Sequence, residues 1–163
     1  MILFAAGALL ICNLHQWTAR REKRTYWYNE AKKRAEETGK ALVVIGDPDG
    51  GVTHGDYGYG DLCIDLTGCP NAPKGLSIDL SKDKIPYPDN SCVVFCCYVL
   101  ELVPNPELAY KEFQRVAGKD IFVLCLTPEE LSFYSYPGVI NDIKAPPFYQ
   151  EFSYTSGWQR SFK

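Results

Sequence analysis

Ile85-Pro-Tyr-Pro-Asp-Asn-Ser-Cys-Val-Val-Phe-Cys-Cys-Tyr-Val-Leu-Glu-Leu-Val-Pro-Asn-Pro-Glu-Leu-Ala-Tyr-Lys-Glu-Phe-Gln-Arg-Val116 is the stretch that decides the fold. Its segment 92–99 is an apolar run rich in β-branched and aromatic residues, and turn-forming residues precede it. Such a run is typical of a strand buried on both faces of a parallel sheet. Residues 107–116 then have helical spacing, and 120–126 form a second apolar run. The order strand, helix, strand predicts a right-handed parallel crossover.

Three shorter apolar runs, at 41–45, 62–66 and 75–80, precede this unit and predict three more strands. We therefore expect an α/β fold: a mostly parallel Rossmann-like sheet of five to seven strands with flanking helices, preceded by an N-terminal apolar helix. The residues after Thr127 are rich in aromatic residues and proline. They fit one or two edge strands, and they fit the lining of a substrate pocket equally well.

The first nineteen residues carry no charge. As a helix they would span about 28 Å, just under the ~30 Å hydrocarbon core of a bilayer. Three interpretations stay open: a single-pass membrane anchor over 1–17, a cleaved signal peptide, or a helix that is buried against the domain or lies on a membrane surface. Four basic residues follow within 20–24. If the segment spans a membrane, the positive-inside rule leaves the main domain in the cytoplasm.

Residues 18–39 are expected to form a juxtamembrane helix ending at Gly39, and 40–163 the α/β domain. Tyr26, Trp27, Ala31 and Ala35 form a stripe that docks on the sheet, unless the helix is a solvated spacer. Its basic face would favour anionic lipid.

Composition excludes several classes of protein. With 46% hydrophobic and 23% charged residues, the chain is globular. Residues 41–163 hold nine Lys or Arg against sixteen Asp or Glu, so a nucleic-acid-binding surface is not expected there. Four of the seven cysteines, Cys92, Cys96, Cys97 and Cys125, fall in the two buried strands expected around 92–99 and 120–126, where cysteine packs as a small hydrophobe. We predict that no cysteine forms a disulfide and that no metal site is present, since no paired C-x-x-C pattern occurs.

The first expected strand runs into a glycine-rich turn, Gly46-Asp-Pro-Asp-Gly-Gly51. In a Rossmann-like sheet such a turn lies beneath the ligand, and glycine lets the backbone approach closely. Gly46, Asp47, Pro48 and Gly50 are therefore candidate cofactor-binding residues. The turn lacks a G-x-G-x-x-G pattern and a lysine for phosphate, so it indicates neither an NAD nor an ATP site.

Two acids end the next two expected strands. Asp65 lies nineteen residues after Gly46, a spacing that suits a carboxylate accepting both ribose hydroxyls of a nucleoside cofactor. Asp79 ends the following strand. For each acid the alternative is a turn or helix cap. His54, in a glycine-rich loop, is a candidate base, and the alternative is a histidine on the surface.

The stretch 85–116 also resembles the fourth-strand region of Rossmann-like, class I S-adenosylmethionine methyltransferases. In that family the run reads roughly Pro-Phe-Pro-Asp-Asn-Ser-Phe-Asp, then a strand, Leu-Glu-His-Val, and a helix ending Glu-x-x-Arg-Val. This chain has Pro-Tyr-Pro-Asp-Asn-Ser, then Val-Leu-Glu-Leu-Val and Glu-Phe-Gln-Arg-Val. The similarity covers about residues 41 to 127, in a shortened form close to the small-molecule methyltransferases. It implies S-adenosylmethionine as cofactor, with Asp79 binding the adenine amino group and Leu80 packing on the ring.

The chain departs from the family pattern at several positions. Val44 stands where the family has an acid, Val93 where it often has Asp, and Leu102 where it has His. Polar candidates near the transferred methyl are then Glu101 and Tyr98, which join His54 as catalytic candidates. The resemblance implies methyl transfer to a small-molecule or lipid-like acceptor. The alternative is a catalytically inactive methyltransferase-fold binding or scaffold module, tethered to a membrane by the N-terminus.

Overall fold

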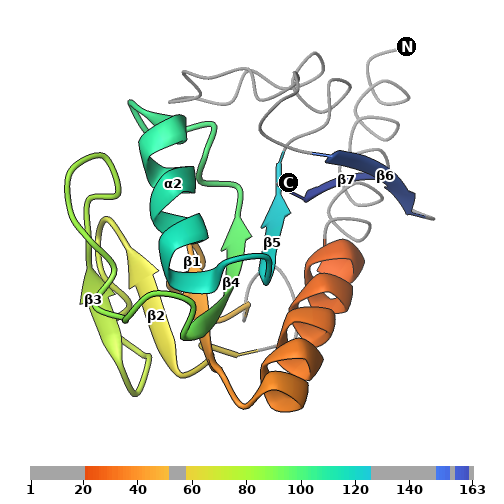
Figure 1. The fold of residues 1–163 in the computed structure, drawn as a ribbon, viewed down its shortest axis with the longest axis horizontal. Coiled ribbons are helices and arrows are strands. Elements are labelled where there is room, and N and C mark those ends of the chain that lie inside the picture. The colour runs from red at the N-terminus through yellow and green to blue at the C-terminus, as the bar shows by residue number, and fades with distance from the viewer. Residues whose placement is uncertain (1–20, 52–57, 126–149, 155–156, 162–163) are drawn as a thin grey trace, which may run out of the picture.

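The computed structural model describes residues 21–51, 58–125, 150–154 and 157–161. Five parallel strands form the centre of one sheet: β1 (Ala41–Ile45), β2 (Leu62–Asp65), β3 (Gly75–Ser77), β4 (Cys92–Cys97) and β5 (Ile121–Leu124). An antiparallel hairpin of β6 (Gln150–Tyr154) and β7 (Gly157–Ser161) extends the sheet beyond β5 (Figure 1). The predicted α/β fold with a mostly parallel sheet is confirmed.

The strand order is β3-β2-β1-β4-β5-β7-β6. The chain moves outward from β1 to β3 and then returns to the other side of β1, where β4 pairs with it from Ala41↔Cys92 to Ile45↔Cys96. The order therefore reverses between β1 and β4. In open α/β sheets, ligands bind at such a switch point, beyond the carboxyl ends of the strands.

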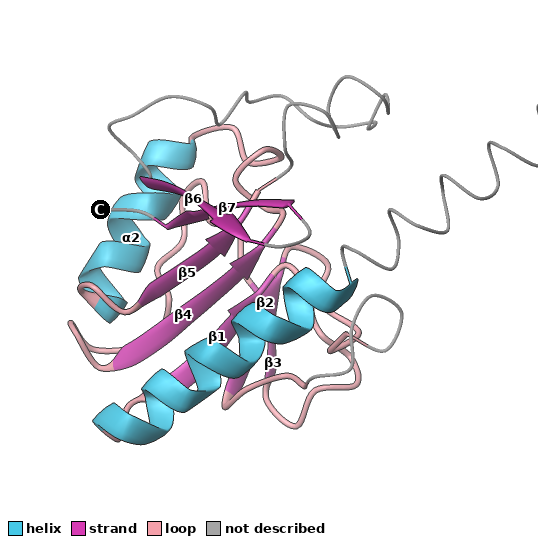
Figure 2. Ribbon diagram, turned by 90° about the vertical axis from the view of Figure 1, so that its right-hand side faces the viewer, coloured by secondary structure: helices cyan, strands magenta, loops and turns pink. Residues whose placement is uncertain are grey.

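The two faces of the sheet are covered by different helices (Figure 2). One face packs on α2 (Pro106–Ala117), and Val43 and Ile45 of β1 belong to that apolar cluster. The other face packs on a helix over residues 21–38, and Leu42 and Val44 belong to that cluster. This alternation is the period-two pattern of a strand buried on both sides.

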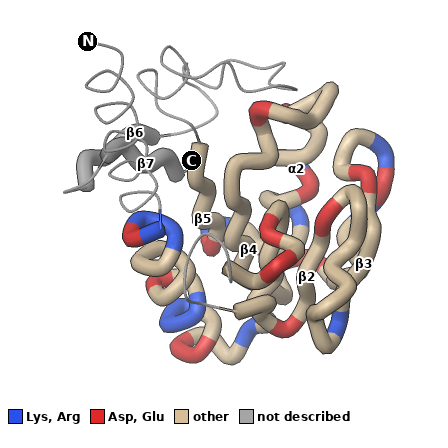
Figure 3. Tube along the Cα trace, turned by 180° about the vertical axis from the view of Figure 1, so that it is seen from behind, with Lys and Arg blue, Asp and Glu red and all other residues tan. Residues whose placement is uncertain are grey.

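Helix 21–38 docks on the sheet, as the first of its two interpretations predicts. Ala31 and Ala35 of the expected stripe are buried and Trp27 packs against the same cluster, whereas Tyr26 is exposed and Tyr28 is buried. Polar contacts add to this packing at the far end, where Arg34 and Lys40 both contact the carboxylate of Asp120 at 2.7 Å. Figure 3 shows charged residues of both signs along this helix.

No helix in the part of the chain that the structure describes is long and apolar enough to cross a membrane. Residues 1–17, for which the sequence predicts an anchor, lie outside that part. The expected N-terminal apolar helix, the membrane attachment and the orientation of the domain therefore stay predictions.

The helix α2 begins and ends where its sequence directs. Asn105 is its N-cap, and the side-chain oxygen accepts a hydrogen bond from the backbone N–H of Leu108 at 3.0 Å. Pro106 follows at the first turn, where a missing N–H costs nothing. Gly118 ends the helix with a φ of 62°.

Arg115, in the last turn of α2, ties the start of the 85–116 stretch to its end. The guanidinium donates to the carbonyl oxygens of Ile85 at 3.0 Å and Tyr87 at 2.9 Å. It also donates to both carboxylate oxygens of Glu112, at 2.6 and 2.9 Å, and to Asp89 at 2.8 Å. The turn before β4 is thereby held against the helix that follows it.

The prediction that no cysteine forms a disulfide is wrong. Cys63 of β2 and Cys69 are bonded, with their Cα atoms 6.0 Å apart. The connection after β2 folds back along the strand, where the Cys63 N–H donates to the carbonyl of Lys74 at 2.9 Å, and this brings Cys69 beside Cys63. The other cysteines of the described segments are buried thiols, namely Cys92, Cys96, Cys97 and Cys125.

Candidate functional site

Two adjoining cavities open at the carboxyl ends of β1 to β4, and Gly46 lines both. The first, which we call the apolar cavity, has a volume of about 220 Å³. Its walls come from the ends of β1 and β2, from the turn after β3, and from residues after β4: Ile45, Gly46, Ile64, Asp65, Leu66, Ile78, Asp79, Leu80, Val99, Leu102, Val103 and Pro104.

Four residues predicted from the sequence thus lie around one cavity: Gly46, Asp65, Asp79 and Leu80. They come together because the carboxyl ends of parallel strands meet at one edge of the sheet. β3 is shorter than expected and ends at Ser77, so Asp79 lies in the turn after it.

Asp65 both caps a turn and lines the apolar cavity. Its Oδ1 accepts hydrogen bonds from the backbone N–H of Thr67 at 2.9 Å and from the Thr67 hydroxyl at 2.7 Å. Both contacts use Oδ1 alone, and a carboxylate has about four acceptor positions. The turn-cap interpretation is therefore correct, and it leaves acceptor capacity on the side chain.

Asp79 is more fully engaged. Its Oδ1 accepts from the Ser81 hydroxyl at 2.6 Å and the Ser81 N–H at 3.0 Å, and its Oδ2 lies 3.1 Å from the Lys82 Nζ. The hydrogen bonds from Ser81, helped by Lys82, hold the pKa of Asp79 below its usual range. Asp79 is thus charged at neutral pH, and any ligand must share its oxygens with these contacts.

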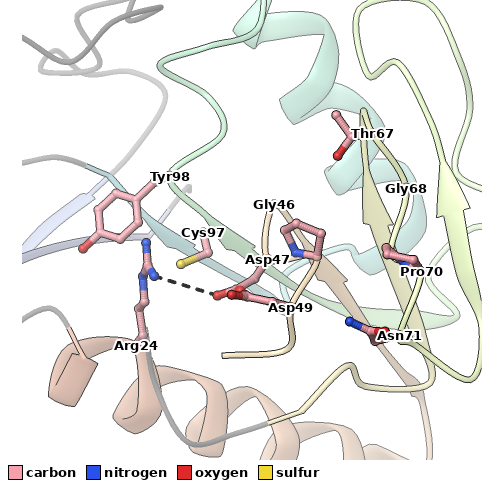
Figure 4. A pocket seen from close by; sticks show the side chains of 11 residues that line it. Arg24, Gly46, Asp47, Asp49, Thr67, Gly68, Pro70, Asn71, Cys97 and Tyr98 are labelled. Carbon is pink, nitrogen blue, oxygen red and sulfur yellow. Dashed lines mark ion pairs between the residues drawn. The ribbon is translucent and has the colours of Figure 1, made fainter. Parts of the chain in front are cut away.

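The second cavity, which we call the polar cavity, has a volume of about 520 Å³ (Figure 4). The turn after β1 supplies Asp47, Pro48 and Asp49, and the connection after β2 supplies a second wall. The end of β4 and helix 21–38 complete the lining, which is Arg24, Gly46, Asp47, Pro48, Asp49, Thr67, Gly68, Pro70, Asn71, Cys97 and Tyr98.

Arg24 reaches this cavity from helix 21–38. Its guanidinium lies 4.7 Å from the centre of the Tyr98 ring, and Nη1 lies 4.0 Å from Oδ2 of Asp47 (Figure 4). The Asp47 side chain is only 3% exposed, and a buried carboxylate requires a counter-charge. Arg24 supplies that charge, and it also makes a cation–π contact with Tyr98.

The backbone is strained or tightly packed at two points of the site. Gly46 has a φ of +79°, and a Cβ there would overlap the Val99 side chain and lie 2.8 Å from the carbonyl oxygen of Cys97. Tyr98 has a φ of 55°, which is uncommon for an aromatic residue. Strain of this kind clusters at functional sites, and here it lies at the switch point.

The remaining predicted residues are placed differently. Gly50 lines neither cavity; its φ of +62° and the Tyr59 ring, 2.7 Å from a Cβ built there, explain the glycine. Among the catalytic candidates, Tyr98 lines the polar cavity, whereas Glu101 is buried and lines neither cavity. His54 lies outside the described residues.

Sequence reasoning missed Arg24. The signal that places it was present, because Arg24, Tyr28, Ala31 and Ala35 follow one another at steps of four, three and four and so share a helical face. Ala31 and Ala35 were assigned to the docked face, and extending that face by two turns leads to Arg24.

The described residues contain no group of three or more His, Cys, Asp or Glu side chains arranged to hold a metal ion. Comparison of the chain with models of protein families, with curated proteins and with solved structures finds no match.

Proposed function

We propose that this chain binds S-adenosylmethionine at the switch point of its sheet and transfers a methyl group to a small-molecule or lipid-like acceptor. One observation carries the proposal: Gly46, Asp65, Asp79 and Leu80, the residues matched to nucleoside binding, line a single apolar cavity. The resemblance of 85–116 to class I methyltransferases supports it, as does the closing antiparallel hairpin of β6 and β7, which that family also has.

The apolar cavity suits a nucleoside. Ile45, Ile78 and Leu80 offer apolar walls to a purine ring, and Asp65 offers a charged acceptor to ribose hydroxyls. Gly46 fits the same role, because it lines both cavities and a side chain there would overlap Val99, which lines the apolar cavity. A ligand longer than a nucleoside would extend past Gly46 into the polar cavity.

The cofactor would supply an electrophilic methyl group on a sulfonium. The protein's part in such chemistry is mainly to hold two reactants in line, since proximity and alignment supply most of the acceleration. In the polar cavity the Tyr98 ring and the Asp47 carboxylate are groups that attract a cation, and both already contact the Arg24 guanidinium, so a sulfonium would compete with Arg24 for them. A base is required only if the acceptor atom carries a proton.

A binding module without catalysis is the second candidate, and a specific observation favours it. Of the catalytic candidates, Glu101 is buried away from both cavities and Tyr98 is in contact with Arg24. Neither described candidate is placed as a ready general base. Binding of S-adenosylmethionine without turnover of any acceptor would support this second function.

Calorimetric titration of the full chain with S-adenosylmethionine tests the proposal. Asp65→Ala removes the acceptor for ribose, and a hydrogen bond to a charged group contributes about 1.5–3 kcal/mol. We expect affinity to fall about ten- to a hundredfold, at ~1.4 kcal/mol per decade. The matched control is Asp89→Ala, the same change at an exposed carboxylate in the turn before β4.

Two results would count against the proposal. If the wild-type chain shows no binding at about millimolar S-adenosylmethionine, the methyltransferase function is rejected. If the chain binds but Asp65→Ala binds equally well, the nucleoside lies elsewhere and the assignment of the apolar cavity is wrong.

A further inference from the structure

The connection between β2 and β3 is held to the fold at one buried residue. From Leu66 to Lys74, a stretch that is described throughout, every residue is exposed or half-buried except Cys69. Leu66 itself is 67% exposed. Cys69 is anchored through its disulfide to Cys63, which is fully buried in β2. The disulfide therefore attaches the middle of this connection to the core, and the hydrogen bond from the Cys63 N–H to the Lys74 carbonyl, at 2.9 Å, attaches its end.

The same disulfide lies next to residues that line both the polar and the apolar cavity. Thr67, Gly68, Pro70 and Asn71, on either side of Cys69, line the polar cavity. Asp65 and Leu66, between the two cysteines in sequence, line the apolar cavity. A change in the position of Cys69 would therefore move one wall of each cavity.

Further contacts link the disulfide to the neighbouring strands. The Cys63 sulfur lies 3.6 Å from the carbonyl oxygen of Asp47, in the turn that follows β1. A Cβ built on Gly75, the first residue of β3, would overlap the backbone of Cys69. The connection thus packs directly against the edge strand and the glycine-rich turn.

The fold itself does not depend on this bond. Stabilisation by a disulfide grows with the length of the loop that it closes, and here the cysteines are only six residues apart. The core is built from β1, β2, β4 and β5, and from helices on both faces. A protein of this size does not need a disulfide staple. In the cytoplasm, the compartment that the sequence predicts for this domain, a disulfide is usually transient and serves catalysis or redox sensing.

We propose that the Cys63–Cys69 disulfide is a redox switch: oxidised, it fixes the 66–74 connection against both cavities, and reduced, it releases that connection. Its effect on ligand binding rests on the proposed function, whereas the release of the connection does not. The reduced state has a place for the buried sulfur, since a Cys63 thiol would lie at hydrogen-bonding distance from the Asp47 carbonyl.

The exchange needs a dithiol reductant, which is oxidised in turn. A thiolate of the reductant attacks the sulfur of Cys69, the less buried of the two, and Cys63 leaves as a thiolate that takes up a proton. The second thiol of the reductant then attacks the mixed disulfide. Cys69 is released as a thiol, and the reductant carries away the new disulfide. Two electrons and two protons are thereby transferred to the protein.

The test is hydrogen exchange of the full chain with and without dithiothreitol, read by mass spectrometry for peptides within 66–74. Loss of a six-residue cross-link is worth about 2 kcal/mol in the chain-entropy account, or roughly thirtyfold in a local opening equilibrium. We expect exchange in 66–74 to accelerate by up to about that factor while β1 and β4 do not change. Alkylation in denaturant before reduction should leave residues 63 and 69 unmodified.

Two variants sharpen the test. Cys69→Ser should show the fast exchange whether or not dithiothreitol is present. Cys92→Ala, which removes a buried thiol outside the connection, should keep the full response. Affinity for S-adenosylmethionine, measured in parallel, should fall on reduction of the wild-type chain and should not respond to reductant in Cys69→Ser.

Three results would overturn the switch. In the first, residues 63 and 69 would be alkylated in denaturant without reductant. In the second, exchange in 66–74 would be the same in both redox states. In the third, reduction would also expose β1 and β4, which would make the disulfide a structural staple. If S-adenosylmethionine binds in neither redox state, the proposed function fails, and the exchange data still decide on the switch.

Discussion

Replacing Arg115 by methionine should weaken the fold at the stretch that defines it. Methionine retains much of the apolar stem and removes the guanidinium fork. The change leaves the carbonyls of Ile85 and Tyr87 without their side-chain donor and deprives Glu112 of both its contacts with Arg115. Glu112 still accepts from the backbone N–H of Ile85 at 2.8 Å, so its carboxylate stays in place after the substitution.

The size of the loss follows from burial. The Glu112 side chain is 12% exposed, so an uncompensated charge there is costly, whereas Arg115 is 26% exposed and water replaces part of what is lost. The pair with Asp89, which is 79% exposed, contributes little. Hydrogen bonds to charged groups contribute about 1.5–3 kcal/mol each when shielded, so after this discount we expect Arg115→Met to cost about 2–4 kcal/mol.

Urea unfolding measures this loss against two further variants. Asp89→Ala removes only the exposed partner and should change the free energy of unfolding by less than about 0.5 kcal/mol. Arg115→Met combined with Glu112→Leu removes both charges and should recover about half of the loss, since the buried carboxylate is gone. A loss below about 0.5 kcal/mol for Arg115→Met alone would refute the reasoning, because the network would then be no more than a surface contact.

The same network gives the loss a pH dependence. Burial tends to raise the pKa of Glu112, but the hydrogen bonds from Arg115 and from the Ile85 N–H outweigh it and hold the pKa below its usual value. In the wild-type chain, Glu112 therefore stabilises the fold above its unfolded pKa of about 4.3, and this is lost as pH falls through the lower folded pKa. Without Arg115, burial is the larger influence on Glu112, and protonation of its carboxyl group removes the cost of burying an unpaired charge. The difference between the two proteins should accordingly shrink below about pH 4.

Two more predictions concern the turn after β1 and the far end of helix 21–38. Gly46→Ala should lower the free energy of unfolding in urea by about 2–4 kcal/mol, because the new Cβ would overlap Val99 and the residue would also have to adopt a positive φ. Gly39→Ala is the control for backbone strain alone, since Gly39 has a φ of +65° and nothing lies within 4 Å of a Cβ built there. Equal losses for the two would show that the Gly46 turn is not tightly packed. Burial tends to raise the pKa of Asp120, but its contacts with Lys40 and Arg34 outweigh burial and lower that pKa. The stability of the fold should therefore decrease as the pH drops through the folded pKa of Asp120. Asp120→Asn should flatten the plot of unfolding free energy against pH between about pH 5 and 2.

The central strands and α2 were predictable because their signals are local. Residues 41–45 form β1 as expected, and the apolar run 92–99 and the helical run 107–116 correspond to β4 and α2 within a few residues. β3 is shorter than the run 75–80 suggests, because its three residues are all exposed at the edge of the sheet. Ile78 and Leu80 point into the core from the turn that follows, so the apolar pattern continues past the end of the strand.

The site was predictable only where it lies at strand ends. Asp65 and Asp79 come together because parallel strands align their carboxyl ends, and that is a consequence of topology. Arg24 and the Cys63–Cys69 bond depend on how separate segments pack, and no local pattern specifies such packing. The prediction that no cysteine forms a disulfide failed at Cys63, whose partner lies in the connection that folds back along β2. The four cysteines in β4 and directly after β5 are free thiols.

Two of the three departures from the methyltransferase pattern, Val44 and Val93, are explained by packing. Val44 and Val93 are fully buried in the cluster beneath helix 21–38, so an acid at either position would have to be buried against Tyr28 and Phe95. Their apolar character is therefore explained by the docked helix. The buried acid beside the candidate site is Asp47, directly after Gly46, and its partner Arg24 comes from the same helix.

Leu102 is the departure with a chemical consequence. It is 48% exposed and lines the apolar cavity, so packing does not require an apolar residue there. A histidine at this position would place a titratable group beside the proposed cofactor, whereas leucine extends the apolar wall outward. A methyltransferase built in this way gains apolar contact with its acceptor and loses a general base, which favours acceptor atoms that react without giving up a proton first.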